Sequence, residues 1–87
     1  MELKRGTQII YVPDHANDDV NHPDCEPGFT SVVLQSGQLL RCRYWSKTYP
    51  GELRTRSNSE LAHERNLVVR DTVPQAQVEA ALEKYCG

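Results

Sequence analysis

The sequence predicts a small, mainly β domain of the α+β class, in which four or five short antiparallel strands form a barrel and one α-helix follows. Two observations favour this class. Short runs of β-branched and aromatic residues alternate with Gly- and Pro-containing segments, which is typical of strands joined by turns. Near the C-terminus, apolar residues recur at helical spacing instead. The 87 residues predict one domain, 1–87, with the barrel in 1–71 and the helix in 72–86.

Three segments carry the strand pattern most clearly. The run TQIIYV at Thr7–Val12 predicts the first strand, which Pro13 ends. The runs FTSVVLQ at Phe29–Gln35 and QLLRCRYW at Gln38–Trp45 predict the second and third strands. Because Ser36-Gly37 between them is a tight-turn signal, we expect these two strands to form a hairpin.

The remaining predicted elements are shorter. Leu53–Arg56 predicts a short fourth strand and Asn66–Arg70 a final one, whereas the polar stretch 57–65 predicts no definite element. A helix is expected over Val73–Tyr85, because its apolar residues share one face and the capping box Thr72-Val73-Pro74-Gln75 marks its start. A bent sheet of this size usually closes on itself to limit free edges. This favours an SH3-like small barrel over an open sheet crossed by the helix.

Alternation along the third predicted strand separates its residues between two faces. The face expected to belong to the core carries Leu40, Cys42 and Tyr44. The face expected to point to solvent carries Leu39, Arg41, Arg43 and Trp45. Cations beside an aromatic ring suit single-stranded nucleic acid, which small barrels bind through backbone contacts and base stacking. An alternative binding site is therefore this basic-aromatic face, formed by Arg41, Arg43, Trp45 and Lys47.

The most unusual segment is the loop Pro13–Gly28, between the first two predicted strands. A polar connection of this length in a short chain is seldom only a connection, so we expect it to carry the function. It contains two histidines and Cys25 but no lysine or arginine. Its five acids give it a formal charge of −5, and they are Asp14, Asp18, Asp19, Asp24 and Glu26.

The same loop holds potential metal ligands and potential catalytic groups. The paired spacing of zinc ribbons and fingers is absent, as is the regular acidic spacing of a calcium loop. We therefore expect no metal and no cofactor, and a loop metal site is an alternative. The favoured interpretation is that His22-Pro23-Asp24 braces the loop through hydrogen bonds to its backbone, with His22 and Asp24 as the bracing residues. Cys25 beside His22 matches no catalytic signature, so we expect no enzyme and no catalytic residue.

Charge is distributed unevenly along the chain. The net charge of −2 argues against a strongly nucleic-acid-binding protein. Residues 38–56 nevertheless carry five basic residues and one acid, a formal +4 that opposes the acidic loop. In the simpler interpretation, the two regions attract each other across the fold or are merely solvated. In the other, they form an acidic face and a basic face of the molecule. The three cysteines (Cys25, Cys42 and Cys86) lack C-x-x-C spacing, and no signal peptide precedes the first strand, so we expect the reduced cytosol.

The order of features resembles two families. GTQIIYV, a loop, GFTSVV and a strand ending in RCRYW resemble the SH3-like barrels of the KOW and Tudor type, over about the first half of the chain. VPDHANDDVNHPDCEPGFTSV, followed by CRYW and LRTRSNSE, is similar to a family of short uncharacterised bacteriophage and prophage proteins, over about residues 5–70. The specific part is the HPD-x-E-x-G run at His22–Gly28. This resemblance implies an accessory role in a bacterial or phage-infected cell and supplies no catalytic residues.

These observations predict a non-enzymatic phage or prophage accessory module that binds a protein partner, one form being an inhibitor of a host system. Tryptophan, tyrosine and arginine are common anchors of protein interfaces, and an acidic loop steers a domain to a basic surface. Nucleic-acid binding through the basic-aromatic face is the alternative. No segment has the length of a membrane span, so we expect a cytoplasmic protein without membrane association. The expected partner-binding residues are Asp14, Asp18, Asp19, Asp24 and Glu26.

Overall fold

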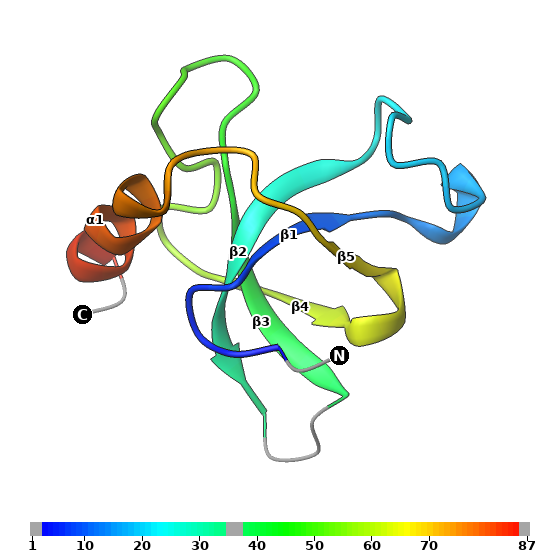
Figure 1. Cartoon of the computed structure of the whole chain (residues 1–87), viewed down its shortest axis with the longest axis horizontal. Helices are drawn as coiled ribbons and strands as arrows, with labels where there is room; N and C mark the ends of the chain where they lie inside the picture. The colour runs from blue at the N-terminus through cyan, green and yellow to red at the C-terminus, as the bar shows by residue number, and fades with distance from the viewer. Residues whose placement is uncertain (1–2, 35–37, 86–87) are drawn as a thin grey trace.

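The computed structural model describes residues 3–34 and 38–85 and has one curled antiparallel sheet that forms a half-barrel, with a single α-helix at the C-terminal end (Figure 1). The mainly β prediction is therefore confirmed. The strand order in the sheet is β4-β3-β2-β1-β5. The elements are β1 (Gln8–Tyr11), the 3₁₀ turn η1 (Asp14–Ala16), β2 (Glu26–Val33), β3 (Leu39–Tyr44), β4 (Glu60–His63), the 3₁₀ turn η2 (Glu64–Asn66), β5 (Leu67–Val69) and α1 (Gln75–Tyr85).

The prediction of a strand at Leu53–Arg56 is wrong. In this segment only Leu53 joins the sheet, through an isolated bridge to Trp45. The next residues follow β3 without continuing the ladder, because the Thr55 hydroxyl accepts the hydrogen bond from the Tyr44 backbone N–H, 3.0 Å away. The fourth strand is β4, inside the polar stretch that predicted no element, and it pairs with the first four residues of β3. The predicted turn Ser36-Gly37 lies outside the described residues.

One face of the sheet carries the core residues that the sequence predicted on the third strand. Leu40, Cys42 and Tyr44 alternate along β3 and are all buried. They pack with residues of the neighbouring strands in one cluster, together with Ile9, Ala62 and Leu67. The expectation of a core face on this strand is therefore confirmed, and it follows from the two-residue period of side chains in a strand.

On the opposite face of β3, Arg43 and Trp45 are also buried, which corrects the expectation that they point to solvent, whereas Leu39 is exposed and Arg41 is half-buried. Arg43 is 8% exposed and Trp45 is 6% exposed. Arg43 lies against the segment after Leu53, where it donates to the Thr55 carbonyl oxygen. Trp45 is covered instead by α1, whose apolar residues pack onto this part of the sheet in a second cluster (Figure 1). The members of this cluster are Phe29, Trp45, Leu53, Val78, Ala81 and Leu82. An amphipathic helix needs an apolar surface to cover, and here that surface is supplied by Phe29 and Trp45.

The start of α1 differs from the predicted capping box. The helix begins at Gln75, and the backbone before it is held by the buried side chain of Gln8 in β1. The Gln8 Oε1 atom accepts hydrogen bonds from the backbone N–H groups of Thr72 (3.0 Å) and Val73 (3.1 Å). The Gln75 side chain donates to the Gly6 carbonyl oxygen, 3.1 Å away, and so points to the sheet. A residue distant in sequence thus fixes where the helix starts.

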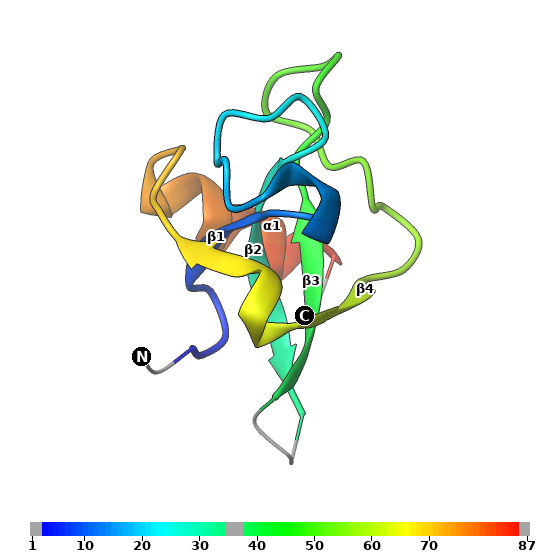
Figure 2. The same ribbon diagram turned by 90° about the vertical axis from the view of Figure 1, so that its right-hand side faces the viewer.

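The two outermost strands of the sheet, β4 and β5, are neighbours in the chain. Only the short turn η2 separates them, as Figure 2 shows. The long loop between β1 and β2 lies on the side of the sheet away from α1, since α1 is behind it in Figure 2 and at the opposite side of Figure 1. Within the described ranges, no helix is long and apolar enough to cross a membrane.

Candidate functional site

The loop between β1 and β2 has a regular path rather than an extended one. Five backbone hydrogen bonds within the loop join residues that are three positions apart. In the first, the Ala16 N–H donates to the Pro13 carbonyl oxygen, and in the last, the Cys25 N–H donates to the His22 carbonyl oxygen at 3.0 Å. Asn17 and Asp18 take left-handed conformations, with φ of 50° and 63°. Asn and Asp tolerate this region better than other residues with side chains, which explains their place in the bend. The polar composition of the loop is therefore needed for its turns.

The loop has a small apolar core of its own. Ala16 and Cys25 are buried against Ile10 and Val12, and partly buried Val20 and Val68 complete the cluster. The Cys25 thiol donates to the Asp19 carbonyl oxygen, with Sγ and O 3.2 Å apart. Cys25, considered above as a nucleophile, is therefore packed inside the loop.

Asn66 of η2 ties the start of the loop to the sheet. Its Nδ2 atom donates to the Val12 carbonyl oxygen at 3.0 Å and to Asp14 Oδ1 at 2.8 Å. The Val12 backbone N–H donates in turn to the Asn66 carbonyl oxygen at 2.7 Å. No local sequence signal relates Asn66 to the loop, because 52 positions separate it from Asp14.

Three polar side chains of the loop converge at its surface: His15, His22 and Asp24. One potential ligand atom from each lies within 4.8 Å of the other two. His15 Nε2 and Asp24 Oδ2 are hydrogen-bonded at 2.7 Å, and the two imidazole rings meet edge to face with centroids 5.3 Å apart. His22 Nδ1 accepts a hydrogen bond from the Asp24 backbone N–H at 3.0 Å. The Asp24 carboxylate, the other group expected to brace the loop backbone, is bonded to the His15 ring instead.

The environment of Asp24 favours its ionised form. The hydrogen bond with His15 holds the pKa of the Asp24 carboxyl below its ordinary value, and the charges of His22 and Lys47 act in the same direction. Lys47 reaches the loop from the segment after β3, where its Nζ donates to the Pro23 carbonyl oxygen at 2.7 Å. Asp24 therefore carries its charge at the loop surface over the physiological pH range.

The acids of the loop differ in what they already contact. Asp14 accepts from Asn66, and Asp19 Oδ1 accepts from the Asn21 backbone N–H at 3.0 Å. Asp18 is exposed and has no side-chain partner in the described part of the chain. Of the expected binding residues, Asp18 is thus the one whose carboxylate is fully available.

Glu26, at the end of the loop, joins the acidic and basic regions of the sequence. Arg54 binds Glu26 with Nε and Oε1 2.8 Å apart, and it binds Glu60 of β4 at 2.9 Å. The guanidinium also lies 5.5 Å from the centre of the Tyr44 ring. The Arg54–Glu26 ion pair and the contact of Lys47 with the loop join the basic segment 38–56 to the acidic loop. These contacts agree with the expectation that the two regions attract each other across the fold.

The basic-aromatic face is divided by the fold. Trp45 lies under α1, and Arg43 is buried with Nη1 donating to the carbonyl oxygen of Thr55 at 2.5 Å. Arg41 is half-buried and donates to the Ser59 carbonyl oxygen at 3.2 Å, while Lys47 contacts the acidic loop. Because Trp45 is covered, its ring is not accessible for stacking on a base in this conformation. The four residues do not form one surface.

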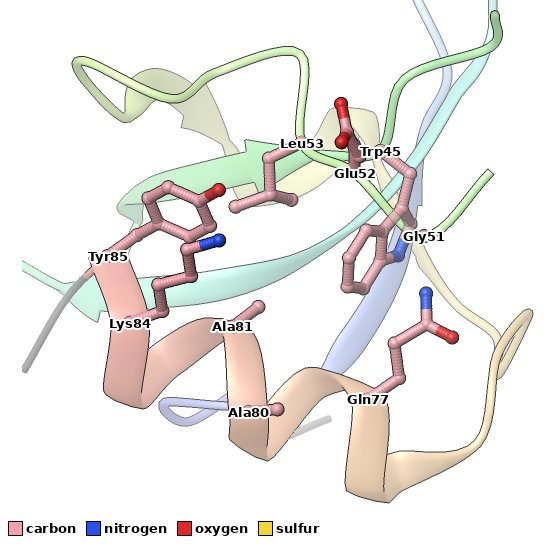
Figure 3. A pocket seen from close by; sticks show the side chains of 9 residues that line it. All are labelled: Trp45, Gly51, Glu52, Leu53, Gln77, Ala80, Ala81, Lys84 and Tyr85. Carbon is pink, nitrogen blue, oxygen red and sulfur yellow. The ribbon is translucent and has the colours of Figure 1, made fainter. Parts of the chain in front are cut away.

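A shallow pocket that the sequence did not indicate lies between α1 and the segment after β3 (Figure 3). Its volume is about 260 Å³. Figure 3 shows Tyr85 and Trp45 on opposite sides of it, with Leu53 between them and the Lys84 side chain extending beside the Tyr85 ring. The helical spacing of apolar residues could have indicated that α1 covers a strand face, but it does not say which one.

Comparisons with protein-family models, with curated proteins and with solved structures found no match to this chain.

Proposed function

We propose that this chain is a non-enzymatic binding module whose acidic loop recognises a basic surface on a protein partner. The observation that supports this most is that the loop has a fixed shape and still presents uncompensated charge. Ala16 and Cys25 anchor it from inside, whereas Asp18 projects without a partner in the described residues. A loop whose shape is already set loses little conformational entropy on binding, so more of the interaction energy appears as affinity.

The acids of the loop contribute unequally to the proposed surface. Asp18, Asp19 and Asp14 are exposed and lie along the first half of the loop. Asp24 and Glu26 already have partners in His15 and Arg54, so they add less to the attraction of a distant cation. Charged rims of this kind mainly raise the rate of association and select the partner by sign of charge.

The SH3-like interpretation of the barrel belongs to the same proposal. It is supported by the strand order, with β1 between β2 and β5, and by the 3₁₀ turn between β4 and β5. In that scheme the acidic loop lies between the first two strands, where such barrels have a long recognition loop. The burial of Cys25 supports a binding role rather than a nucleophilic one.

We further propose that the module serves a phage or prophage in the bacterial cytoplasm, one form being inhibition of a host system. The support is the resemblance of the His22–Gly28 run and its flanks to short phage proteins. Many host targets with nucleic-acid-binding surfaces are basic, and an acidic loop complements such a surface.

The test is a capture experiment with the whole chain immobilised and a bacterial lysate as the source of partners. We expect wild type to retain a defined set of basic proteins that is released by raised salt, because screening shortens the range of surface charges to a few ångströms. Asp18→Lys reverses the charge with no side-chain contact to lose, and Asp18→Asn removes the charge while keeping a residue that tolerates the left-handed backbone at this position. We expect both variants to lose this set.

The matched control is Asp71→Lys, which makes the same charge change at another exposed residue. Asp71 follows β5 and lies near the start of β1, whereas the acidic loop follows the end of β1. We expect it to capture as wild type does. Equal retention of the same proteins by wild type and Asp18→Lys would contradict the proposal.

A further inference from the structure

We propose that His15, His22 and Asp24 form a surface site for a divalent transition-metal ion, with zinc as the ion that fits the ligands best. The proposal goes beyond the binding function above and stands on separate observations. Two imidazoles and one carboxylate are the ligand types that zinc takes in proteins, and their potential ligand atoms already lie within 4.8 Å of one another. The sequence alone did not predict this convergence, since the ligands are seven and two positions apart.

The distances require only a small contraction. Zinc bonds of about 2.0–2.1 Å in tetrahedral geometry place ligand atoms roughly 3.3 Å apart. The three atoms are within 4.8 Å, so they must approach by at most about 1.5 Å. His15 Nε2 and Asp24 Oδ2, at 2.7 Å, must instead separate slightly as a metal ion replaces the shared proton. His15 and Asp24 are 62% and 60% exposed, which leaves their side chains free to make these movements.

The backbone that carries the ligands is fixed independently of any metal. Ala16 follows His15 and Cys25 follows Asp24, and both of these neighbours are buried in the apolar core of the loop. The His22 backbone N–H donates to the Asp19 carbonyl oxygen at 3.1 Å, and its carbonyl accepts from Cys25 at 3.0 Å. A preformed site of this kind binds a metal with little cost in ordering the chain.

The electrostatic surroundings favour a cation. Asp14, Asp18 and Asp19 add negative charge along the same loop, opposed by Lys47 at the Pro23 carbonyl. Three protein ligands at an exposed position leave the fourth tetrahedral position to water or to a group from another molecule. Magnesium prefers oxygen ligands in octahedral geometry and is not expected to occupy the site.

Metal binding would alter one hydrogen bond that can be observed directly. His22 Nδ1 accepts a hydrogen bond from the Asp24 backbone N–H. If the metal binds Nδ1, this lone pair is no longer available. If it binds Nε2, the ring proton moves to Nδ1, which then cannot accept. Either route frees the Asp24 amide, so its NMR signal reports occupation of the site.

The experiment is a titration of ¹⁵N-labelled protein with ZnCl₂, followed by amide spectra and by calorimetry. The protein is free of affinity tags and carries Cys86→Ser, so that a thiol at the end of the chain does not compete. We expect binding of one zinc ion with a large shift of the Asp24 amide, and no such change with MgCl₂. His15→Gln, His22→Gln and Asp24→Asn should each weaken zinc binding by at least about tenfold, since even an outer-shell partner of a metal site contributes that much.

The matched control is His63→Gln. His63 is the third histidine of the chain, and its Nδ1 also accepts a backbone N–H, from Arg65 at 3.2 Å, but it lies outside the cluster. We expect His63→Gln to bind zinc as the parent does. Dispersed amide spectra identify variants that remain folded, and Asp24→Asn keeps the shape of the side chain it replaces. The absence of saturable binding at millimolar zinc, or equal loss in His63→Gln and the cluster variants, would overturn the proposal.

Discussion

The ring of Phe29 in β2 lies against the indole of Trp45, with centroids 5.4 Å apart and planes inclined by 53°. Both side chains are on the face of the sheet that α1 covers. Trp45 is the only tryptophan of the chain, so its fluorescence reports this packing alone.

Trp45→Ala should lower the free energy of unfolding by about 3–5 kcal/mol, because removal of a large buried aromatic leaves a cavity under the helix. Urea denaturation followed by circular dichroism measures this loss. Tyr49→Ala is the control: Tyr49 is an aromatic residue in the next segment that is 63% exposed. Its replacement should change stability by less than about 0.5 kcal/mol. Similar effects of the two substitutions would contradict the position of Trp45 under α1.

Gly28→Ala should destabilise the chain by about 3 kcal/mol or more, at the upper end of what overpacking costs. A Cβ at Gly28 would lie 2.1 Å from the Arg43 carbonyl oxygen and 2.9 Å from the Tyr44 Cα, so backbone atoms of β3 would have to move. At Gly51, φ is +82° but nothing lies within 4 Å of an added Cβ. Gly51→Ala should therefore cost only about 1–2 kcal/mol, from its backbone conformation. Thermal unfolding of both variants tests the difference in size.

Gln8→Ala should detach the start of α1 from the sheet. Besides accepting from Thr72 and Val73, the Gln8 amide donates to the Val73 carbonyl oxygen at 2.8 Å. Loss of these hydrogen bonds leaves part-buried backbone groups without partners, and we expect a cost of about 2 kcal/mol or more. Hydrogen exchange should speed up first in α1. Gln77→Ala is the control, because the Gln77 side chain makes no hydrogen bond within the described residues, and it should leave exchange in α1 nearly unchanged.

Alkaline pH should destabilise the fold through Cys42. Burial raises the pKa of the Cys42 thiol from 9.0 to about 11. The unfolded chain therefore releases this proton from about pH 9, while the folded chain keeps it until about pH 11. Because the folded state binds the proton more tightly, stability is complete below pH 9 and falls as pH rises toward 11, by up to about 1.4 kcal/mol per pH unit. Burial also raises the pKa of Tyr44, which acts in the same direction.

The measurement is urea denaturation at intervals between pH 8 and pH 10.5, with Cys42→Ala as the comparison. We expect a shallower pH dependence in Cys42→Ala than in wild type, because only the contribution of Tyr44 and of exposed groups remains. Parallel curves would show that Cys42 does not hold its proton in the folded chain.

Local patterns predicted those elements whose residues repeat with a clear period. The two-residue alternation in 39–45 placed Leu40, Cys42 and Tyr44 on a core face, and the helical spacing placed α1 to within two residues of its start. The same alternation could not show that Trp45, on the other face, is buried as well. That result depends on where α1 packs, which is a long-range contact. The strand β4 was missed because only Ala62 of its four residues is buried, so it has almost no apolar pattern.

The candidate site was predictable in composition and not in geometry. The length and polarity of the loop indicated the segment, and the His22-Pro23-Asp24 run indicated the backbone contact of His22 but not the hydrogen bond between Asp24 and His15. The proximity of His15 to Asp24 follows from a chain of turns that depends on left-handed Asn17 and Asp18, and the anchoring by Asn66 comes from across the sheet. Neither is encoded in a spacing that can be recognised from the sequence.

The three-residue turn η2 determines more than the connection between two strands. In a flat five-stranded sheet, β4 and β5 would lie four strand spacings apart, about 19 Å. The four steps of backbone from His63 to Leu67 span at most about 14 Å. The flat form is therefore geometrically inaccessible to this sequence of elements. The sheet must curve because the connection η2 between β4 and β5 is short. This curvature would persist even if individual side chains of the core were exchanged for others of similar volume.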